Sequence, residues 1–255
     1  MTVSSREVDL VVIGNLLIDQ LPNSVVEPGG AALYSTLAAA QLGIRVGLHS
    51  VIGQDYPLHH LTKAGVDLNL HRLNGPGGRT VIRYSEQGRQ LIHAGPGHET
   101  MTPQTQHPFQ TKLVVLAPMP WEWQLFHLDH CQTRTALLDP YPTLNQERWS
   151  DLESRVDKLR FLVLNREELE MELGAIPAQV PILLKEGAAG GVSRACGTRW
   201  RAPHVKVVDP TGAGDSFVAG VAAGLVRGLD LEDCLEQGAC LAARVIQHLG
   251  ARALY

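Results

Sequence analysis

Short, unbroken hydrophobic runs recur along the chain and predict β-strands. Each run is rich in β-branched residues and is bounded by Gly, Pro, Asn or Asp. Because the strands of a parallel sheet are covered by helices on both faces, runs that do not alternate with polar residues favour such a sheet. The predicted strands are Val8–Ile13, Val46–Ile52, Leu113–Ala117, Thr135–Leu138, Phe161–Leu164, Pro181–Leu184 and Val205–Val208.

Helical stretches lie between these runs, and a glycine directly follows most of them. A glycine in that place is a common helix stop. Strand and helix therefore alternate, which predicts an α/β fold: a doubly wound, mainly parallel sheet flanked by helices, in a single domain spanning residues 1–255. The predicted helices are Ala31–Leu42, Arg148–Lys158, Glu167–Leu173, Asp215–Arg227 and Leu231–Leu249.

One region departs from this alternation. The segment Thr80–Ala94 has two strand-like runs around a glycine-containing turn, which predicts a β-hairpin. Leu21–Pro28 predicts a further exposed strand. We therefore expect a small β lid, formed by residues 20–28 and 78–95, near the strand ends at which α/β proteins bind ligands. A plain surface hairpin is the alternative.

Composition narrows the classes of function. A charged fraction of 19% and a formal net charge of -4 give no basic excess, so we expect no nucleic-acid partner. No apolar run reaches membrane-spanning length and the first residues do not resemble a secretion signal, so we expect a cytoplasmic enzyme without a membrane partner. The cysteines form no CxxC pair and are expected to be reduced core thiols; they are Cys131, Cys196, Cys234 and Cys240.

Two other residue pairs carry weaker signals. Trp121 and Trp123 lie two residues apart in a strand-like stretch, so we expect them to share a face that packs internally or contacts another subunit. His59 and His60 are adjacent, and the histidines form no HExxH motif, so we expect this pair to be solvated.

The segment Val207–Gly220 carries the clearest chemical signal. A strand-like run leads through Gly212-Ala213-Gly214 into a helix of small residues whose first acidic group is Asp215. Converging backbone N–H groups and the roughly half positive charge of a helix start predict an anion site. A carboxylate would oppose a static phosphate there, but beside a transferring phosphoryl group it can take the proton of the attacking hydroxyl. Asp215 is therefore the candidate general base; the alternative is a simple helix N-cap.

Other glycine-turn motifs do not fit this segment. A dinucleotide fingerprint would need glycine where the chain has Phe217, and a nucleophile elbow would need glycine in place of Val218. The P-loop pattern GxxxxGK[ST] is absent from the sequence. The turn is therefore neither a nicotinamide site nor a hydrolase elbow.

Shorter motifs accompany this turn along nearly the whole chain. They are Ile13-Gly14-Asn15, Asp19, Gly29-Gly30, Leu42-Gly43, Ile52-Gly53-Gln54-Asp55, Gly65-Val66-Asp67, Asp139-Pro140, Asn165-Arg166-Glu167-Glu168 and His248-Leu249-Gly250-Ala251. In this order and spacing, together with Asp209–Asp215, they resemble the ribokinase-like, PfkB-type carbohydrate kinase family. The order is more specific than any single piece.

The resemblance implies roles around the turn. Asp215 would be the catalytic base, and the amides of Gly212, Ala213 and Gly214 would hold the transferring phosphoryl group in an anion hole. Asp209 would help bind a monovalent cation, K⁺ in many relatives.

The resemblance also implies an acceptor site. Asp19 would accept hydrogen bonds from two acceptor hydroxyls, with Asn15 among the substrate-binding positions. Gly29 and Gly30 would let the acceptor approach the backbone closely, as residues without a Cβ allow. The alternatives are a turn or cap role for Asp19 and a plain helix entry for the glycine pair.

For the nucleotide, the resemblance implies that Asn165 and Glu168 organise Mg²⁺, with Glu168 acting through water. Gly187 and Thr211 would lie among the nucleotide-binding positions. The alternative for Glu168 is a first-turn carboxylate that the helix dipole favours.

Two positions depart from the family pattern. Tyr34 stands where many relatives carry a sugar-binding Asn, and it offers a flat apolar face. We hypothesise that Tyr34 contacts an acceptor with a face to stack on, such as a cyclitol, a nucleoside or a modified hexose. Lys185 either reaches the nucleotide phosphates as a point charge or pairs with a surface carboxylate.

These observations predict an ATP- and Mg²⁺-dependent phosphotransferase that phosphorylates a hydroxyl of a sugar or sugar-like molecule. A non-catalytic sugar-binding regulator of the same fold and a kinase for a hydroxymethylpyrimidine- or pyridoxal-type vitamin are the alternatives. A homodimer is compatible with the resemblance.

Overall fold

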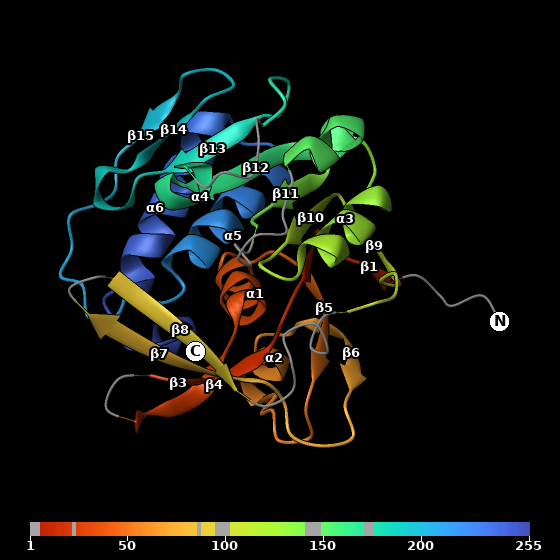
Figure 1. Ribbon diagram of the computed structural model, residues 1–255, viewed down its shortest axis with the longest axis vertical. Helices are drawn as coiled ribbons and strands as arrows, with labels where there is room; N and C mark the ends of the chain where they lie inside the picture. The colour runs from red at the N-terminus through yellow and green to blue at the C-terminus, as the bar shows by residue number, and fades with distance from the viewer. Residues whose placement is uncertain (1–5, 22–23, 86–87, 95–102, 141–148, 171–175) are drawn as a thin grey trace.

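A central sheet with helices on both faces organises the protein. The computed structural model describes residues 6–21, 24–85, 88–94, 103–140, 149–170 and 176–255. Within them, nine strands form one sheet in the order β15-β14-β13-β12-β11-β10-β2-β5-β6 (Figure 1). The strands are β2 (Leu10–Ile13), β5 (Val46–Ile52), β6 (Asp67–Arg72), β10 (Leu113–Leu116), β11 (Ala136–Leu138), β12 (Leu159–Asn165), β13 (Ile182–Lys185), β14 (Gly191–Ser193) and β15 (Arg199–Trp200).

Pairing within this sheet is parallel from β6 to β13 and antiparallel only at the β13-β14-β15 edge. This arrangement confirms the doubly wound, mainly parallel fold class. The short strands β1 (Arg6–Glu7) and β9 (Phe109–Gln110) form a separate parallel pair.

Successive residues of the central strands enter two different cores. Val12 and Val115 pack with one group of helices, whereas Val11 and Val114 pack on the opposite face. This division explains the unbroken hydrophobic runs, because both faces of each strand are covered. The helical elements are α1 (Ala31–Gln41), α2 (His59–Lys63), α3 (Trp121–Asp129), η3 (Trp149–Lys158), α4 (Arg166–Glu170), η4 (Gly187–Ala189), α5 (Ala213–Val226), α6 (Leu231–Val245) and η5 (Arg252–Leu254).

A second, four-stranded sheet lies beside the main one and contains the predicted hairpin (Figure 1). Its order is β4-β3-β7-β8, with β3 (Leu17–Gln20), β4 (Val26–Gly29), β7 (Arg79–Ser85) and β8 (Gly88–Ala94). We call it the lid sheet. Glu27 of β4 forms an ion pair with Arg252 of η5, so the C-terminal segment is fastened to one edge of the lid sheet.

Three points of the predicted secondary structure need correction. Val205–Val208 is not a strand: its backbone joins neither sheet, and Val207 and Val208 are exposed. The N–H of Val208 instead donates to the carbonyl of Ile246 at the end of α6, 2.8 Å away. A β-branched run predicts extended backbone, but it does not show whether a neighbouring strand is present.

The tryptophan pair belongs to a helix rather than a strand. Trp121 and Trp123 both lie in α3, where residues two apart point to different faces. Trp121 is buried against Trp149, whereas Trp123 is partly exposed. The prolines before the helix made its first residue difficult to predict from the sequence.

The third correction concerns helix type and length. Residues Trp149–Lys158 form a 3₁₀ helix, and α6 ends at Val245 rather than Leu249. Part of the predicted helix Glu167–Leu173 lies outside the described residues, as does Arg148.

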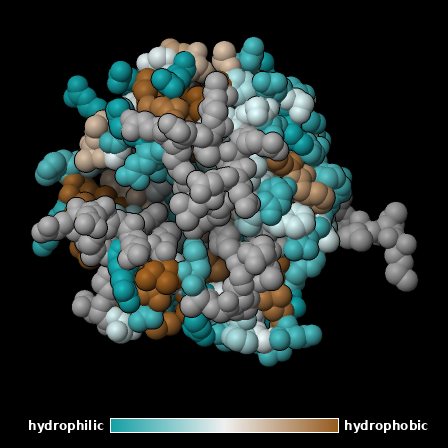
Figure 2. Space-filling view, viewed as in Figure 1, coloured by the Kyte–Doolittle hydropathy of each residue, from teal (hydrophilic) through white to brown (hydrophobic). Residues whose placement is uncertain are grey.

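The surface shown in Figure 2 carries hydrophobic side chains of the described residues in separate groups among hydrophilic ones. Among the described helices, none combines the length and the apolar character that crossing a bilayer requires.

A histidine cluster that includes His49 of β5 and His127 of α3 holds the segment before β9. The Nε2 atoms of His49 and His127 lie 2.7 Å and 2.9 Å from the carbonyl oxygens of Thr105 and Pro103. Burial lowers the pKa of both imidazoles to about 4; hydrogen bonds to backbone carbonyls oppose this shift, and neighbouring histidines add a smaller lowering effect. Burial therefore favours the neutral form of His49 and His127.

This cluster predicts a loss of stability in mild acid. A histidine of pKa about 4 in the folded state and 6.5 when unfolded stabilises the fold fully above pH 6.5, and that contribution falls as the pH drops towards 4. We expect roughly 1.5 kcal/mol of lost unfolding free energy per histidine between pH 6.5 and 5. Urea denaturation at both pH values checks this. The unfolding free energy of the His127→Gln variant should depend less on pH than that of the parent. Equal stabilities of the parent at the two pH values would contradict it.

Candidate active site

The glycine turn at the start of α5 is built on a positive φ angle. Gly212 has φ 77° and is the residue before the first helical position. The first N–H groups of α5 have no partner inside the helix, and one of them, that of Ala213, donates to the Pro210 carbonyl at 3.3 Å. Asp209 connects the turn to the segment after α6 through two hydrogen bonds. Its Oδ1 accepts from the Thr211 N–H at 3.0 Å, and its Oδ2 accepts from the Gly250 N–H at 2.9 Å. These hydrogen bonds hold the turn in place at the carboxyl ends of the central strands.

Tyr34 of α1 supports the same turn. A Cβ added to Gly212 would lie 2.0 Å from the Tyr34 ring, so the backbone rests directly on the phenol. The side chain is 2% exposed. Burial, and then the negative charges of Asp19, Asp209 and Asp215, raise the pKa of Tyr34 well above its usual value. The hydroxyl therefore stays neutral beside these carboxylates.

A cavity of about 120 Å³ opens between the turn, α1 and the lid sheet. It brings together most of the predicted acceptor residues and the candidate base. The predicted residues that line it are Asn15, Asp19, Gly30, Tyr34, Thr211, Gly212 and Asp215. Sequence reasoning missed six others: Leu17, Ala31, Thr80, Ile82, His93 and Pro118.

The position of the Asp19 side chain accounts for the absence of a Cβ at Gly29, the first of the two adjacent glycines. A Cβ on Gly29 would lie 1.9 Å from the Asp19 carboxylate, and the Gly30 N–H donates to the same carboxylate at 3.4 Å. Gly30 has φ 89°, and a Cβ added there would lie 2.5 Å from the backbone carbonyl oxygen of Asn15. The space at Gly29 is thus taken by Asp19, and of the two glycines only Gly30 lines the cavity.

A second cavity, of about 510 Å³, lies on the other side of the turn. Its lining includes the predicted residues Lys185, Gly187, Ala213 and Gly214. Most of the remainder is apolar and was not predicted. These residues come from the β13–β15 edge, from Phe217 of α5, from the 202–210 segment, and from Ala239, Ala242 and Ala243 on α6 with Ile246 directly after it. The helical spacing of small residues on α6 was the available signal, because it leaves room for a flat ligand.

Lys185 lies between this cavity and a buried acidic pair. Its Nζ is 2.9 Å from Oδ1 of Asp139, so its partner is a buried carboxylate and not a surface one. A Cβ on Gly214 would be 3.4 Å from the same Nζ. Burial alone would lower the pKa of Lys185, but Asp139 and Glu168 raise it overall. The ammonium therefore stays charged next to the turn.

The predicted NxxE motif forms a reciprocal cap at the start of α4. The Asn165 N–H donates to Glu168 Oε2 at 2.7 Å, and the Glu168 N–H donates to Asn165 Oδ1 at 2.8 Å. Burial raises the pKa of Glu168 to about 7; Asp139 adds to the rise and Lys185 opposes it. Neither Asn165 nor Glu168 lines either cavity, but the charge of Glu168 acts on Lys185, which lines the 510 Å³ cavity. Among the described residues no group of three or more His, Cys, Asp or Glu side chains is placed to hold a metal ion.

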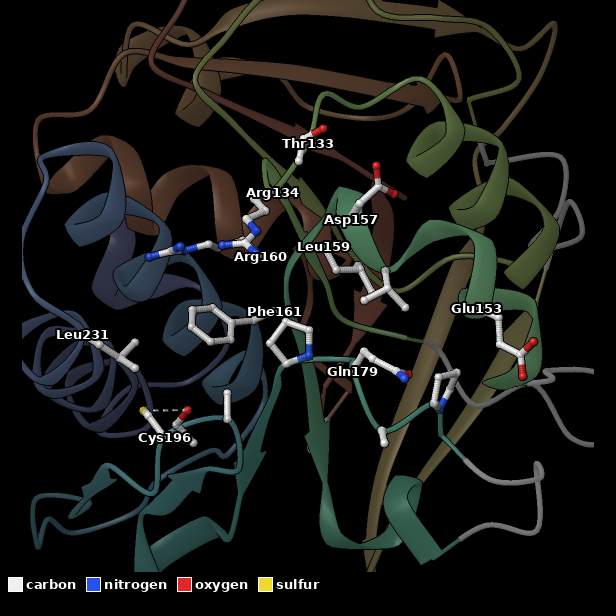
Figure 3. Close-up of a pocket in the computed structure, with 16 residues that line it drawn as sticks. Thr133, Arg134, Glu153, Asp157, Leu159, Arg160, Phe161, Gln179, Cys196 and Leu231 are labelled. Carbon is white, nitrogen blue, oxygen red and sulfur yellow. Dashed lines mark hydrogen bonds between the residues drawn. The ribbon is translucent and has the colours of Figure 1, made fainter.

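A cavity of greater volume than these two lies elsewhere, at the amino ends of β12 and β13 (Figure 3). Its volume is about 1120 Å³, and its labelled side chains mix opposite charges, Arg134 and Arg160 with Glu153 and Asp157. None of the predicted site residues lines it. Convergent polar groups, rather than size, therefore identify the candidate active site.

Several known proteins that resemble this chain are kinases. A cytidine kinase from Thermococcus kodakarensis is 29% identical over 270 residues, which cover 95% of this chain and 97% of the relative. The solved nucleoside kinase of Methanocaldococcus jannaschii, a member of the ribokinase family, has a TM-score of 0.78 at 21% identity and covers 97% of this chain and 95% of its own. The ribokinase of Cryptococcus neoformans in complex with ADP has a TM-score of 0.79 at 22% identity, covering 98% and 96%.

The family model for the pfkB family of carbohydrate kinases matches residues 8–254, nearly the whole chain. The earlier resemblance and the fold class are thus confirmed, and the reading as an enzyme is favoured over a non-catalytic regulator. The chain belongs to the pfkB family of carbohydrate kinases and is a sugar or nucleoside kinase that phosphorylates a hydroxyl group.

Proposed function

We propose that this protein transfers the γ-phosphoryl group of ATP to a hydroxyl of a nucleoside. One observation carries the proposal: the turn Gly212–Gly214 contributes residues to both cavities, with Asp215 on the polar side and Lys185 on the other. A phosphoryl group passing from one cavity to the other would cross this turn. Transfer of this kind depends mainly on positioning and on stabilising negative charge.

The residues would share the reaction as follows. Asp19 accepts hydrogen bonds from acceptor hydroxyls, which turns the reacting hydroxyl towards the turn. Asp215 takes the proton of that hydroxyl as it attacks. The first amides of α5 and the Lys185 ammonium stabilise the charge on the phosphoryl oxygens. The 510 Å³ cavity, with its apolar walls, holds the base of the nucleotide.

The buried pair Glu168 and Asp139 fits a hydrated divalent cation. Burial, with a smaller contribution from the charge of Asp139, raises the pKa of Glu168 to about 7, and a nearby cation would favour its ionised form. Mg²⁺ bound there through water would neutralise charge on the nucleotide phosphates. Both oxygens of Asp209 accept backbone N–H groups, so its part in K⁺ binding stays a prediction.

Two observations support a nucleoside as the acceptor. The relative with 29% identity across 95% of this chain is named a cytidine kinase, and the M. jannaschii neighbour is named a nucleoside kinase. Apolar side chains of Leu17, Ile82 and Pro118 line the acceptor cavity beside the polar groups. Such walls suit a flat heterocycle better than they suit a free polyol.

The decisive experiment offers the protein ATP and Mg²⁺, with and without K⁺, and a panel of acceptors: cytidine, uridine, inosine, adenosine, ribose, fructose, myo-inositol and a hydroxymethylpyrimidine. We expect a nucleoside monophosphate, with kcat/KM about tenfold or more above that for ribose. Mass spectrometry of the product and ADP release provide the measurement. Product from only a free sugar or the vitamin alcohol would overturn the nucleoside assignment, and tight binding without product would restore the regulator.

A further inference from the structure

Arg252 of η5 joins the C-terminal segment to the lid sheet. Its Nε and Nη2 both donate to Oε1 of Glu27 on β4, with Nε at 2.7 Å. Figure 1 places the C-terminus beside the lid sheet. Glu27 is paired directly with Asp19 of β3, and directly paired residues project from the same face of a sheet. The ion pair therefore lies one strand away from the residue assigned to the acceptor.

Two helices hold η5 on its other side. The carbonyl of Ala253 accepts from Nε2 of Gln41, at the end of α1, and from Nη2 of Arg244 in α6, both at 3.0 Å. The side chains of Gln41 and Arg244 are also hydrogen-bonded to each other, at 2.6 Å. These contacts keep η5 in place on α1 and α6, so Arg252 links the lid sheet to the helices of the main sheet.

Gly250, two residues before Arg252, connects the same segment to the anion turn. Its N–H donates to Asp209 Oδ2 at 2.9 Å, and Oδ1 of that carboxylate accepts from the Thr211 N–H. Gly250 has φ 55°, and a Cβ added there would lie 2.9 Å from Glu27 Oε2. A continuous series of contacts therefore runs from β4 through the C-terminal segment to the turn.

Glu27 depends on the charge of Arg252. The Glu27 side chain is 14% exposed, whereas that of Arg252 is 50% exposed. Oε2 of Glu27 is buried and has no hydrogen-bond partner among the described residues. An exposed ion pair contributes little, but a mostly buried carboxylate that loses its cation is strongly destabilised. Without Arg252, we therefore expect β4 and the strand paired with it to shift towards water.

We propose that Arg252 is a positioning residue for phosphoryl transfer: by holding Glu27, it fixes the lid strands, and the acceptor on Asp19, relative to the turn Gly212–Gly214. Arg252 lines neither cavity, so it acts through other residues. When the ion pair is lost, the acceptor stays bound to the lid but its hydroxyl is misplaced relative to the phosphoryl group. A misplacement of about 1 Å can cost up to about 10² in rate. This inference rests on the proposed function, in the roles of Asp19 and the turn, and holds for any acceptor.

The test compares Arg252→Ala, Arg252→Lys and the double variant Glu27→Gln/Arg252→Ala with the parent. Steady-state kinetics use the acceptor of the panel that the parent phosphorylates best. We expect Arg252→Ala to lower kcat roughly five- to twentyfold, with KM for the acceptor and for ATP within about twofold. Arg252→Lys should restore part of kcat because the positive charge remains. The double variant should also restore part of it, because a buried amide needs no cation.

Arg155→Ala is the matched control. Arg155 also binds a carboxylate through two nitrogens: its Nε and Nη2 donate to Asp129 of α3 at 2.6 Å and 2.8 Å. It lines neither the acceptor cavity nor the 510 Å³ cavity. Arg155→Ala should therefore leave kcat unchanged. Thermal unfolding of every variant separates a loss of stability, which both single alanine variants can show, from a loss in the transfer step.

Each outcome has a defined meaning. Parental kcat in Arg252→Ala, or a raised acceptor KM at unchanged kcat, overturns the inference while the proposed function stands. The same holds if Arg155→Ala loses as much kcat, or if the double variant is no faster than Arg252→Ala. A parent that phosphorylates no acceptor of the panel overturns the proposed function and the inference with it, and this is seen before any variant is made.

Discussion

Asp215→Asn is expected to lower kcat by a factor of about 10² to 10⁴, which corresponds to roughly 2.7 to 5.5 kcal/mol in the activation barrier. The amide keeps the size and the hydrogen-bonding reach of the carboxylate but cannot accept the hydroxyl proton. ATP affinity should change little, because Asp215 lines the acceptor cavity and not the 510 Å³ cavity. Single-turnover kinetics and a nucleotide-binding titration measure the two quantities.

The adjacent helix offers a matched control. Asp233 is the third residue of α6, as Asp215 is of α5, and both are acidic groups in the first turn. Asp233 is exposed and lines neither cavity. Asp233→Asn therefore removes the same helix-dipole interaction without touching the site. If Asp215→Asn retained turnover within a factor of three of the parent, or matched Asp233→Asn, the general-base role would have to be abandoned.

The sequence predicted the fold class because unbroken β-branched runs need cover on both faces. It failed where local pattern and tertiary environment differ. Val205–Val208 has the composition of a strand, but it joins no sheet, and Val205 and Val207 line the second cavity instead. Similarly, Trp121 and Trp123 suggested a two-residue period that the prolines before α3 made plausible.

For the site, motif spacing located residues whose function depends on backbone shape. The turn at Gly212 and the cap formed by Asn165 and Glu168 are local structures, so a few consecutive residues specify them. Thr80 and His93 were missed because they reach the cavity only through the register of the lid strands. A hairpin can be predicted from its turn, but a slip of one residue would turn both side chains to the other face.

Support of the turn by Tyr34 is a further feature that the sequence could not show. The departure from the family Asn suggested a new acceptor contact, and the ring does line the acceptor cavity. It also lies against Gly212, so the phenol has a second role: it packs against the backbone of the predicted anion site. The smaller side chain of Asn would not fill the space that the ring occupies beside Gly212. The identity of residue 34 is therefore linked to the shape of the turn.

Gly212→Ala should therefore reduce kcat/KM by about 10² to 10³, the usual effect of displacing one donor of an anion hole. Two physical costs act together. A residue with a Cβ is strained by roughly 1 to 2 kcal/mol at the φ of 77° that Gly212 adopts. In addition, the new methyl group would lie 2.0 Å from the buried Tyr34 ring, so the turn has to shift towards the cavities.

Gly228, which follows α5, separates these two costs. It has φ 75°, and a Cβ there would meet no atom within 4 Å. Gly228→Ala should lower unfolding free energy by about 1 kcal/mol through backbone strain alone and leave kcat/KM unchanged. Urea denaturation and steady-state kinetics on both variants make the comparison. If the two alanine variants had equal kcat/KM, displacement of the turn by Tyr34 would not matter for catalysis, and the amides of Gly212–Gly214 could not be the groups that stabilise the transferring phosphoryl group.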